Sequence, residues 1–186
     1  MVKLCLSSNG FTNKGCKYLS NSRVLANLTK LQIDSSKCTE EGVKSITHSS
    51  LLCRLSHLSV GDYFHIIDTH DVFTTNPNLK RLVKLDLALA KIGYLGAKNL
   101  ASCENLCNLT SLNLNENEIG SDGLVQLAQS PFLKNLTHLE LDGNNLNSES
   151  CTALVNSAYL TKLRKLSMSN NTLLDTGVTQ LVTCNV

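Results

Sequence analysis

Apolar residues recur along the chain with a period of 27 residues. When the sequence is divided at residues 1, 28, 55, 82, 109, 136 and 163, the fourth position of every segment is leucine. The sixth position is apolar throughout, as Leu6, Ile33, Val60, Leu87, Leu114, Leu141 and Met168. A fixed period of this length indicates a repeat architecture. We therefore expect seven structural turns built to one plan.

Segment 109–135 shows how one period divides into two elements. Leu112 and Leu114 alternate with polar residues, as expected for a short strand with one buried face. From Gly123 onward, helical spacing separates the apolar residues Leu124, Leu127 and Ala128. Just before them, Ser121 supplies a capping side chain and Asp122 a favourable charge for a helix N-terminus. Each turn is therefore predicted to be a strand followed by a helix.

Other segments carry the same signals around the predicted helix. The capping chemistry recurs in Thr39, Glu40, Glu41, Ser148, Glu149 and Asp175. Glycine recurs at the start of the predicted helix, as Gly15, Gly42, Gly96, Gly123 and Gly177. A residue without a side chain allows close backbone packing there. Pro77 and Pro131 lie two periods apart, both after the predicted helix, where no backbone donor need be lost.

A single turn offers too few apolar positions to offset the entropy lost on ordering its backbone, so the turns must stack. Stacking predicts an α/β fold, a solenoid shaped as a horseshoe arc, with a parallel sheet on its concave face. The curvature follows because neighbouring strands are spaced more closely than neighbouring helices. We expect residues 1–186 to form one domain.

The segment LTSLNLNENEIGSDGLVQLA, residues 109–128, resembles leucine-rich repeats of the ribonuclease-inhibitor-like subtype, and the resemblance covers all 186 residues. The GAKNLA element of residues 96–101 also looks like bacterial repeats of this kind, including those of effector proteins. The resemblance implies an asparagine ladder that bonds the turn backbone, formed by Asn9, Asn117, Asn144 and Asn171. Ser36, Tyr63 and Ala90 occupy that position in turns two to four, so the ladder should be interrupted there.

The resemblance further implies that a protein partner binds on the concave face. The outward strand positions and the positions just beyond them carry the predicted partner-binding residues, which are Lys30, Asp34, His57, Lys84, Asp86, Asn113, Asn115, His138, Glu140, Asp142 and Lys165. The alternative is a solvated face whose opposite charges partly neutralise one another. Turn three departs from the consensus and places Tyr63 and Phe64 at the rim, either as an anchor for the partner or repacked into the core.

The amino-acid composition of the chain argues against two classes of partner and indicates a cellular compartment. The formal charge of +2 is spread along the chain without a basic stripe, which argues against nucleic acid. No apolar run approaches the length of about 20 residues that spans a bilayer, so no membrane is expected. The eight cysteines form no CxxC pair and mostly occupy apolar repeat positions, which indicates buried thiols in a reducing compartment. We expect a cytoplasmic protein, or one in the host cytosol if it is a secreted bacterial effector.

The sequence offers little for catalysis. Five potential metal ligands lie within ten residues, namely Asp62, His65, Asp68, His70 and Asp71. Their spacing matches no metal-binding motif of known geometry, so we expect no metal site there. There is no glycine-rich phosphate loop and no thiol or hydroxyl beside an activating base. We therefore predict a chain that is not an enzyme and needs no cofactor.

The function that follows is a protein–protein interaction module. One alternative is a stoichiometric inhibitor of an enzyme such as a nuclease. Another is the recognition or regulatory arm of a larger enzyme, such as a ubiquitin ligase or a GTPase activator. Neither end carries the polar cap of a repeat array, so the sequence predicts a fragment of a longer protein, or end-to-end self-association.

Overall fold

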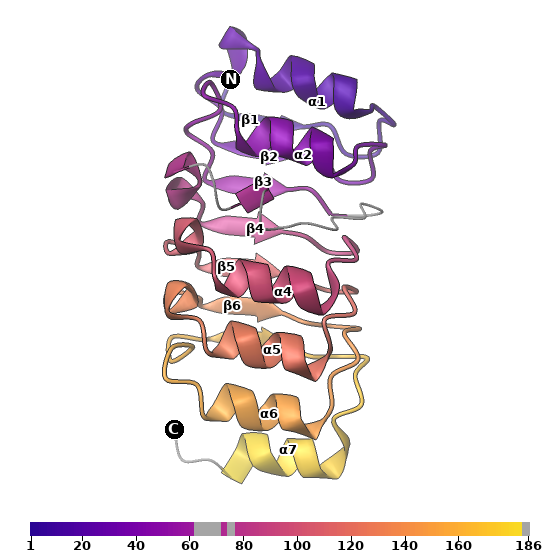
Figure 1. The fold of residues 1–186 in the computed structure, drawn as a ribbon, viewed down its shortest axis with the longest axis vertical. Coiled ribbons are helices and arrows are strands. Elements are labelled where there is room, and N and C mark those ends of the chain that lie inside the picture. The colour runs from indigo at the N-terminus through magenta and orange to yellow at the C-terminus, as the bar shows by residue number, and fades with distance from the viewer. Residues whose placement is uncertain (62–71, 74–76, 184–186) are drawn as a thin grey trace.

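A stack of strand and helix turns runs the length of the computed structural model, which describes residues 1–61, 72–73 and 77–183 (Figure 1). Seven short strands form one parallel sheet in sequence order. Each strand pairs with the residues one repeat further on, so Lys3 faces Lys30 and Lys30 faces His57. The strands are β1 (Lys3–Cys5), β2 (Lys30–Gln32), β3 (His57–Ser59), β4 (Lys84–Asp86), β5 (Ser111–Asn113), β6 (His138–Glu140) and β7 (Lys165–Ser167). The predicted parallel sheet is confirmed.

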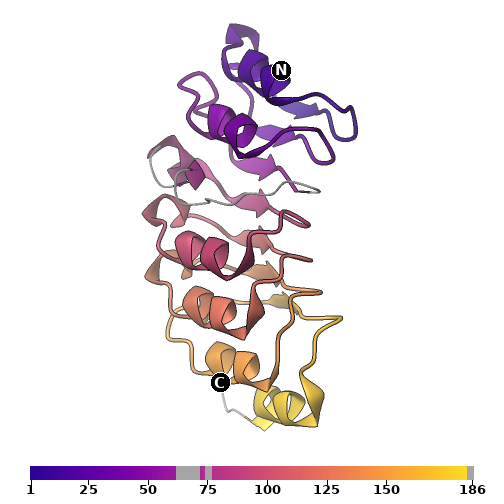
Figure 2. The same ribbon diagram turned by 45° about the vertical axis from the view of Figure 1, so that its right-hand side comes forward.

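Helices lie on the side of the stack opposite the strands, which leaves the sheet on the concave side of the arc (Figure 2). They are α1 (Asn13–Ser20), α2 (Glu40–Thr47), α4 (Gly93–Ala101), α5 (Gly120–Ala128), α6 (Ser148–Val155) and α7 (Leu174–Thr183). Short 3₁₀ turns return the chain to the sheet at η1 (Arg23–Leu25), η2 (Pro77–Arg81), η3 (Glu104–Leu106) and η4 (Pro131–Leu133). Two of them begin at proline, the helical position that loses no hydrogen bond.

The core lies between the two layers and is built from the repeated apolar positions. The fourth-position leucines of turns two to six are at most 1% exposed, and they are Leu31, Leu58, Leu85, Leu112 and Leu139. At the sixth, the side chains are fully buried in Ile33, Val60, Leu87, Leu114 and Leu141. The last turn lacks a neighbour on one side in this structure, and Leu166 there is 37% exposed.

The asparagine ladder forms in the C-terminal turns, as predicted. The buried amide of Asn144 donates to the carbonyls of Leu114 and Asp142, at 2.8 and 3.1 Å. Its oxygen accepts from the backbone N–H groups of Asn117 and Ile119 in the preceding turn. Asn117 and Asn171 repeat this pattern in their own turns. Ala90 carries no polar group at this position, so the ladder is interrupted there.

A second ladder, which joins the ends of helices α1, α4 and α5 to the following turns, was not predicted. Ser130 donates its hydroxyl to the carbonyl of Ala101 in the preceding turn, and Ser157 donates to Ala128. Ser49 does the same to Ser20, and the thiol of Cys103 donates to the carbonyl of Phe73 at 3.3 Å. The three serines satisfy carbonyls that the end of a helix leaves without a partner in the helix itself. Cys103 thus occupies the repeat position that serine fills at Ser49, Ser130 and Ser157.

The predicted helix starts are partly wrong. Helix α5 begins at Gly120 rather than near Gly123, and its start has no side-chain cap. The Ser121 hydroxyl instead bonds the Asn147 amide oxygen of the next turn at 2.8 Å. Thr39 precedes α2 but also makes no capping bond, and Asn147 rather than Ser148 caps α6. Polar groups at these helix starts face the neighbouring turn, so stacking directs their bonds across the repeat.

The glycines at the helix entry do reflect close packing, as predicted. A Cβ atom at Gly96 would lie 2.4 Å from the Cβ of Ile92, and one at Gly42 would lie 3.1 Å from the Cβ of Cys38. Both neighbours occupy the eleventh position of their repeat, with Ile92 one residue before α4 and Cys38 two residues before α2. That side chain lies over the first helical turn, so glycine is needed beneath it.

Candidate functional site

The outward face of the sheet carries aligned columns of side chains, one from each repeat position. The strand pairing places the third-position residues side by side, and we call them the cation column, which comprises Lys3, Lys30, His57, Lys84, Ser111, His138 and Lys165. The fifth-position residues form the polar column, which comprises Cys5, Gln32, Ser59, Asp86, Asn113, Glu140 and Ser167. Alignment follows because every strand has the same register.

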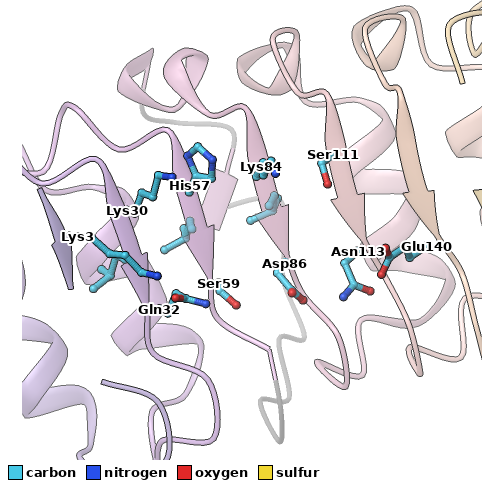
Figure 3. Close-up of a pocket in the computed structure, with 13 residues that line it drawn as sticks. Lys3, Lys30, Gln32, His57, Ser59, Lys84, Asp86, Ser111, Asn113 and Glu140 are labelled. Carbon is cyan, nitrogen blue, oxygen red and sulfur yellow. The ribbon is translucent and has the colours of Figure 1, made fainter. Parts of the chain in front are cut away.

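A shallow hollow of about 310 Å³ lies on this face across β1 to β6. Six of the predicted partner-binding residues line it, namely Lys30, His57, Lys84, Asp86, Asn113 and Glu140. It also contains Lys3 and Ser111, with Gln32 and Ser59, which the sequence prediction missed (Figure 3). Gln32 and Ser59 are uncharged, and their place in the polar column was the signal that could have found them.

The N-terminal half of the hollow is cationic. Lys3, Lys30 and Lys84 are exposed, and within residues 1–61, 72–73 and 77–183 none of them forms an ion pair. His57 lies between Lys30 and Lys84 in the cation column. Burial lowers the pKa of His57 from its ordinary value, and the charges of these two lysines lower it further. The two lysines therefore add to the effect of burial in disfavouring the protonated imidazole.

Removing one flanking charge should change this titration. We expect Lys84→Ala to raise the pKa of His57, because protonation then meets one positive charge fewer. Titration of the His57 ring protons by NMR measures the shift directly. Lys98→Ala on the exposed face of α4 is the matched control and should leave that pKa unchanged. An equal pKa in all three proteins would contradict an electrostatic origin.

The C-terminal half of the face has a different charge balance. Lys165 forms an ion pair with Glu140 at 2.5 Å between Nζ and Oε1, so this cation is already neutralised. Burial raises the pKa of Asp86, although a hydrogen bond from the Ala88 backbone N–H opposes the shift. The negative charges of Asp34 and Glu140 raise it slightly more. Unpaired positive charge is therefore concentrated across β1 to β4.

Three predicted partner-binding residues have structural bonds instead of free polar atoms. One Asp34 carboxylate oxygen accepts from the Ser59 hydroxyl at 2.6 Å and from the Gly61 N–H at 3.0 Å. Asp142 accepts in the same way from Ser167 and Ser169 in the next turn. The amide oxygen of Asn115 accepts from the Asp142 N–H at 2.7 Å. These side chains tie consecutive turns together just beyond the strands, outside the hollow.

The remaining predicted site residues lie elsewhere. His138 and Lys165 belong to the cation column but do not line the hollow. Tyr63 and Phe64, the predicted rim anchor, lie outside the described residues, as do Asp62, His65, Asp68, His70 and Asp71. In the described part of the chain, no three His, Cys, Asp or Glu side chains are grouped so as to hold a metal ion.

Sequence comparison agrees with the architecture. The family described as Leucine Rich repeat matches residues 75–101, 105–128, 132–155 and 159–182, which together exceed half of the chain. The chain belongs to the leucine-rich-repeat family. Repeats of this family generally mediate protein–protein interaction, and repeat solenoids use their concave surface for it.

Solved structures similar to this leucine-rich-repeat protein include the tropomodulin C-terminal domain of Caenorhabditis elegans. The two are 14% identical and superpose with a TM-score of 0.52, over 91% of this chain and 88% of that one. At this identity the likeness shows the fold alone. An internalin (inlF) from Listeria monocytogenes strain 4b F2365 is 17% identical over 91% of this chain and 68% of that one, with a TM-score of 0.28. The comparison with curated proteins gives no match.

Crossing a bilayer needs a helix that is both long and apolar, and none of the helices described for this leucine-rich-repeat protein meets both conditions.

Proposed function

We propose that this leucine-rich-repeat protein binds an acidic segment of a protein partner on its concave face, across β1 to β4. The observation that carries the proposal is the row of lysine ammonium groups at Lys3, Lys30 and Lys84. They line one hollow and have no ion partner among the described residues. Two of them, Lys30 and Lys84, flank His57 and oppose its protonation. A partner with carboxylates would relieve this repulsion.

The polar column supports the same orientation for the partner. Gln32 lies beside the lysines and offers an amide donor and acceptor to a peptide backbone, and the Ser59 hydroxyl, which donates to Asp34, offers its oxygen as an acceptor (Figure 3). Across β5 to β7 the ion pair between Glu140 and Lys165 leaves less charge for a ligand. We therefore place the acidic part of the partner over the N-terminal half, with Asp86, Asn113 and Glu140 contacting a more basic or neutral part.

Charge favours this module over the inhibitor alternative. A basic nuclease would require an acidic concave face, and the hollow presents cations instead. We further propose that residues 1–186 form one recognition domain of the ribonuclease-inhibitor-like subtype. The protein would be a bacterial effector and would act in the cytosol, either of its own cell or of a host. The asparagine ladder supports the subtype, and the buried free thiols of Cys103 and Cys151 support a reducing compartment.

A binding experiment with charge-reversal variants tests the proposal. A fluorescently labelled, glutamate-rich peptide should bind the wild-type protein, and a lysine-rich peptide of equal length should not. The double variant Lys30→Glu, Lys84→Glu should weaken binding of the glutamate-rich peptide by roughly tenfold or more. Each lost ion pair contributes about 0.2 to 1 kcal/mol, and each new glutamate adds repulsion. The variant Lys98→Glu, Lys134→Glu changes net charge equally away from the sheet and should bind like the wild type. Equal weakening by both variants would show a nonspecific charge effect and overturn the proposal.

The same complex should be pH-dependent. Peptide carboxylates beside His57 would raise its pKa above the lowered value of the free protein, so binding takes up a proton. Affinity should therefore increase as the pH falls from about 8 to about 6, where carboxylates stay ionised. Fluorescence anisotropy across this range measures the trend, and His57→Gln should flatten it. A trend that persists unchanged in His57→Gln would assign the proton to another group.

A further inference from the structure

Two buried thiols meet between the first two turns. Cys16 lies on α1 and Cys38 in the loop that leads into α2, with their sulfur atoms 2.9 Å apart. A disulfide bond joins sulfurs at about 2.05 Å, so the two atoms would need to approach by less than about 1 Å. Among the cysteines that the structure describes, no other two sulfur atoms are in contact.

The repeat geometry imposes this contact. Cys16 occupies the sixteenth position of its repeat and Cys38 the eleventh position of the next. A Cβ at Gly42 would lie 3.1 Å from the Cys38 Cβ and 3.2 Å from the Cys16 sulfur. At the other end of the stack, a Cβ at Gly177 would lie 3.1 Å from the Cys151 sulfur and 3.2 Å from the Leu173 Cβ. The two sites match, except that Leu173 replaces the second thiol.

The surroundings make the two sulfurs chemically unequal. The hydrogen bond with Cys16 lowers the pKa of the Cys38 thiol, which burial opposes, and the Ser36 hydroxyl lowers it further from 3.2 Å. The same bond to Cys38 raises the pKa of Cys16, as does burial. Cys38 is therefore the thiol of the pair that ionises first. Cys38 is also 4% exposed, whereas Cys16 is fully buried.

We propose that Cys16 and Cys38 form a redox-active dithiol that a hydroperoxide oxidises to a disulfide between turns one and two. The Cys38 thiolate attacks one oxygen of hydrogen peroxide, the O–O bond breaks and hydroxide departs, so that Cys38 becomes a sulfenic acid. This hydroxide takes up the proton that the Cys38 thiol released on ionising and becomes the first water. The Cys16 sulfur then attacks the Cys38 sulfur and the S–O bond breaks. The departing hydroxide takes up the Cys16 proton and leaves as water. In total, the two thiols lose two electrons and two protons, and peroxide becomes two waters.

The disulfide would fasten two neighbouring parts of the stack. It joins α1 to the segment before α2, and thereby fixes the turn that supplies Lys3 to the concave hollow. Crosslinked turns open less often, so amide exchange in α1 should slow by about tenfold or more in the oxidised protein. A dithiol reductant should restore the original exchange rate.

Peroxide titration followed by mass spectrometry tests the proposal. The purified chain is treated with hydrogen peroxide, its remaining thiols are alkylated under denaturing conditions, and the digest is analysed for linked peptides. The peptides of Cys16 and Cys38 should appear crosslinked at peroxide concentrations at least tenfold below those that modify Cys151. Cys151 is the internal control, because it is equally buried, occupies the equivalent position and faces no thiol.

Variants separate the pair from general oxidation. Cys16→Ala introduces the residue type that Ala97 already provides at the same repeat position. It should abolish the crosslink and leave Cys38 as a sulfenic acid that dimedone traps. Cys151→Ala should leave the yield of crosslink unchanged. Full alkylation of both thiols after peroxide treatment would overturn the proposal, as would crosslinks that form equally among the more accessible Cys5, Cys53 and Cys107.

Discussion

Replacing Asn144 by alanine should destabilise the protein by roughly 3 kcal/mol or more. The side chain is fully buried and satisfies two backbone carbonyls and two backbone N–H groups in adjoining turns. Alanine would leave the Leu114 carbonyl and the Asn117 and Ile119 N–H groups without these bonds, at about 1 to 3 kcal/mol for each group that water cannot reach, whereas the Asp142 carbonyl still accepts from the Glu116 N–H. Urea denaturation followed by circular dichroism measures the loss of unfolding free energy. Amide exchange should accelerate first at Asn117 and Ile119.

Asn9 provides a matched control at the same repeat position. Its amide donates only to the carbonyls of Leu6 and Ser7, and the residue is exposed. Water can replace those bonds, so Asn9→Ala should cost less than about 1 kcal/mol. A similar loss in both variants would show that the position matters for helix or loop propensity rather than for the ladder.

Gly61→Ala should lower the unfolding free energy by roughly 2 to 3 kcal/mol through overpacking between turns three and four. A Cβ at Gly61 would lie 2.3 Å from the carbonyl oxygen and 2.9 Å from the nitrogen of Ala88. These are backbone atoms, so no side-chain rotation relieves the clash and the two segments must separate. The shift would also strain the bond from the Gly61 N–H to Asp34. Chemical denaturation again gives the magnitude.

Gly10→Ala distinguishes crowding from backbone conformation. Gly10 has a φ of +63°, which disfavours a side chain, yet no atom lies within 4 Å of the added Cβ. That variant should therefore lose only about 1 to 2 kcal/mol from conformational strain. If Gly61→Ala proved as stable as the wild type, this would contradict the close approach of the segments that contain Gly61 and Ala88.

Much of the fold could be predicted because burial in this chain depends on position within the repeat. A strand side chain points inward or outward according to its parity, so Leu85 and Leu112 had to lie in one layer. The same parity was enough to place Lys30, His57 and Lys84 in one outward column. The interruption of the asparagine ladder at Ala90 followed equally directly from the residue type.

The candidate site was only partly predictable from the sequence. Whether a polar side chain is available to a partner depends on the hydrogen bonds that it makes with the neighbouring turn. Asp34 and Asp142 had the same outward parity as the lysines, and no pattern in the sequence indicated that Ser59, Ser167 and neighbouring N–H groups would bond them. Ser121 looked like a cap but bonds the next turn instead.

The period, the layers and the register could all be read from the amino-acid sequence, since each of them depends on which positions are apolar. The side chains that meet across adjacent turns could be found only in the folded chain, and they include the contact between Cys16 and Cys38 and the ion pair between Glu140 and Lys165. The cause is the separation of the partners along the chain. Such partners lie about one repeat apart, and their contact depends on how the loops and helix starts of adjoining turns pack.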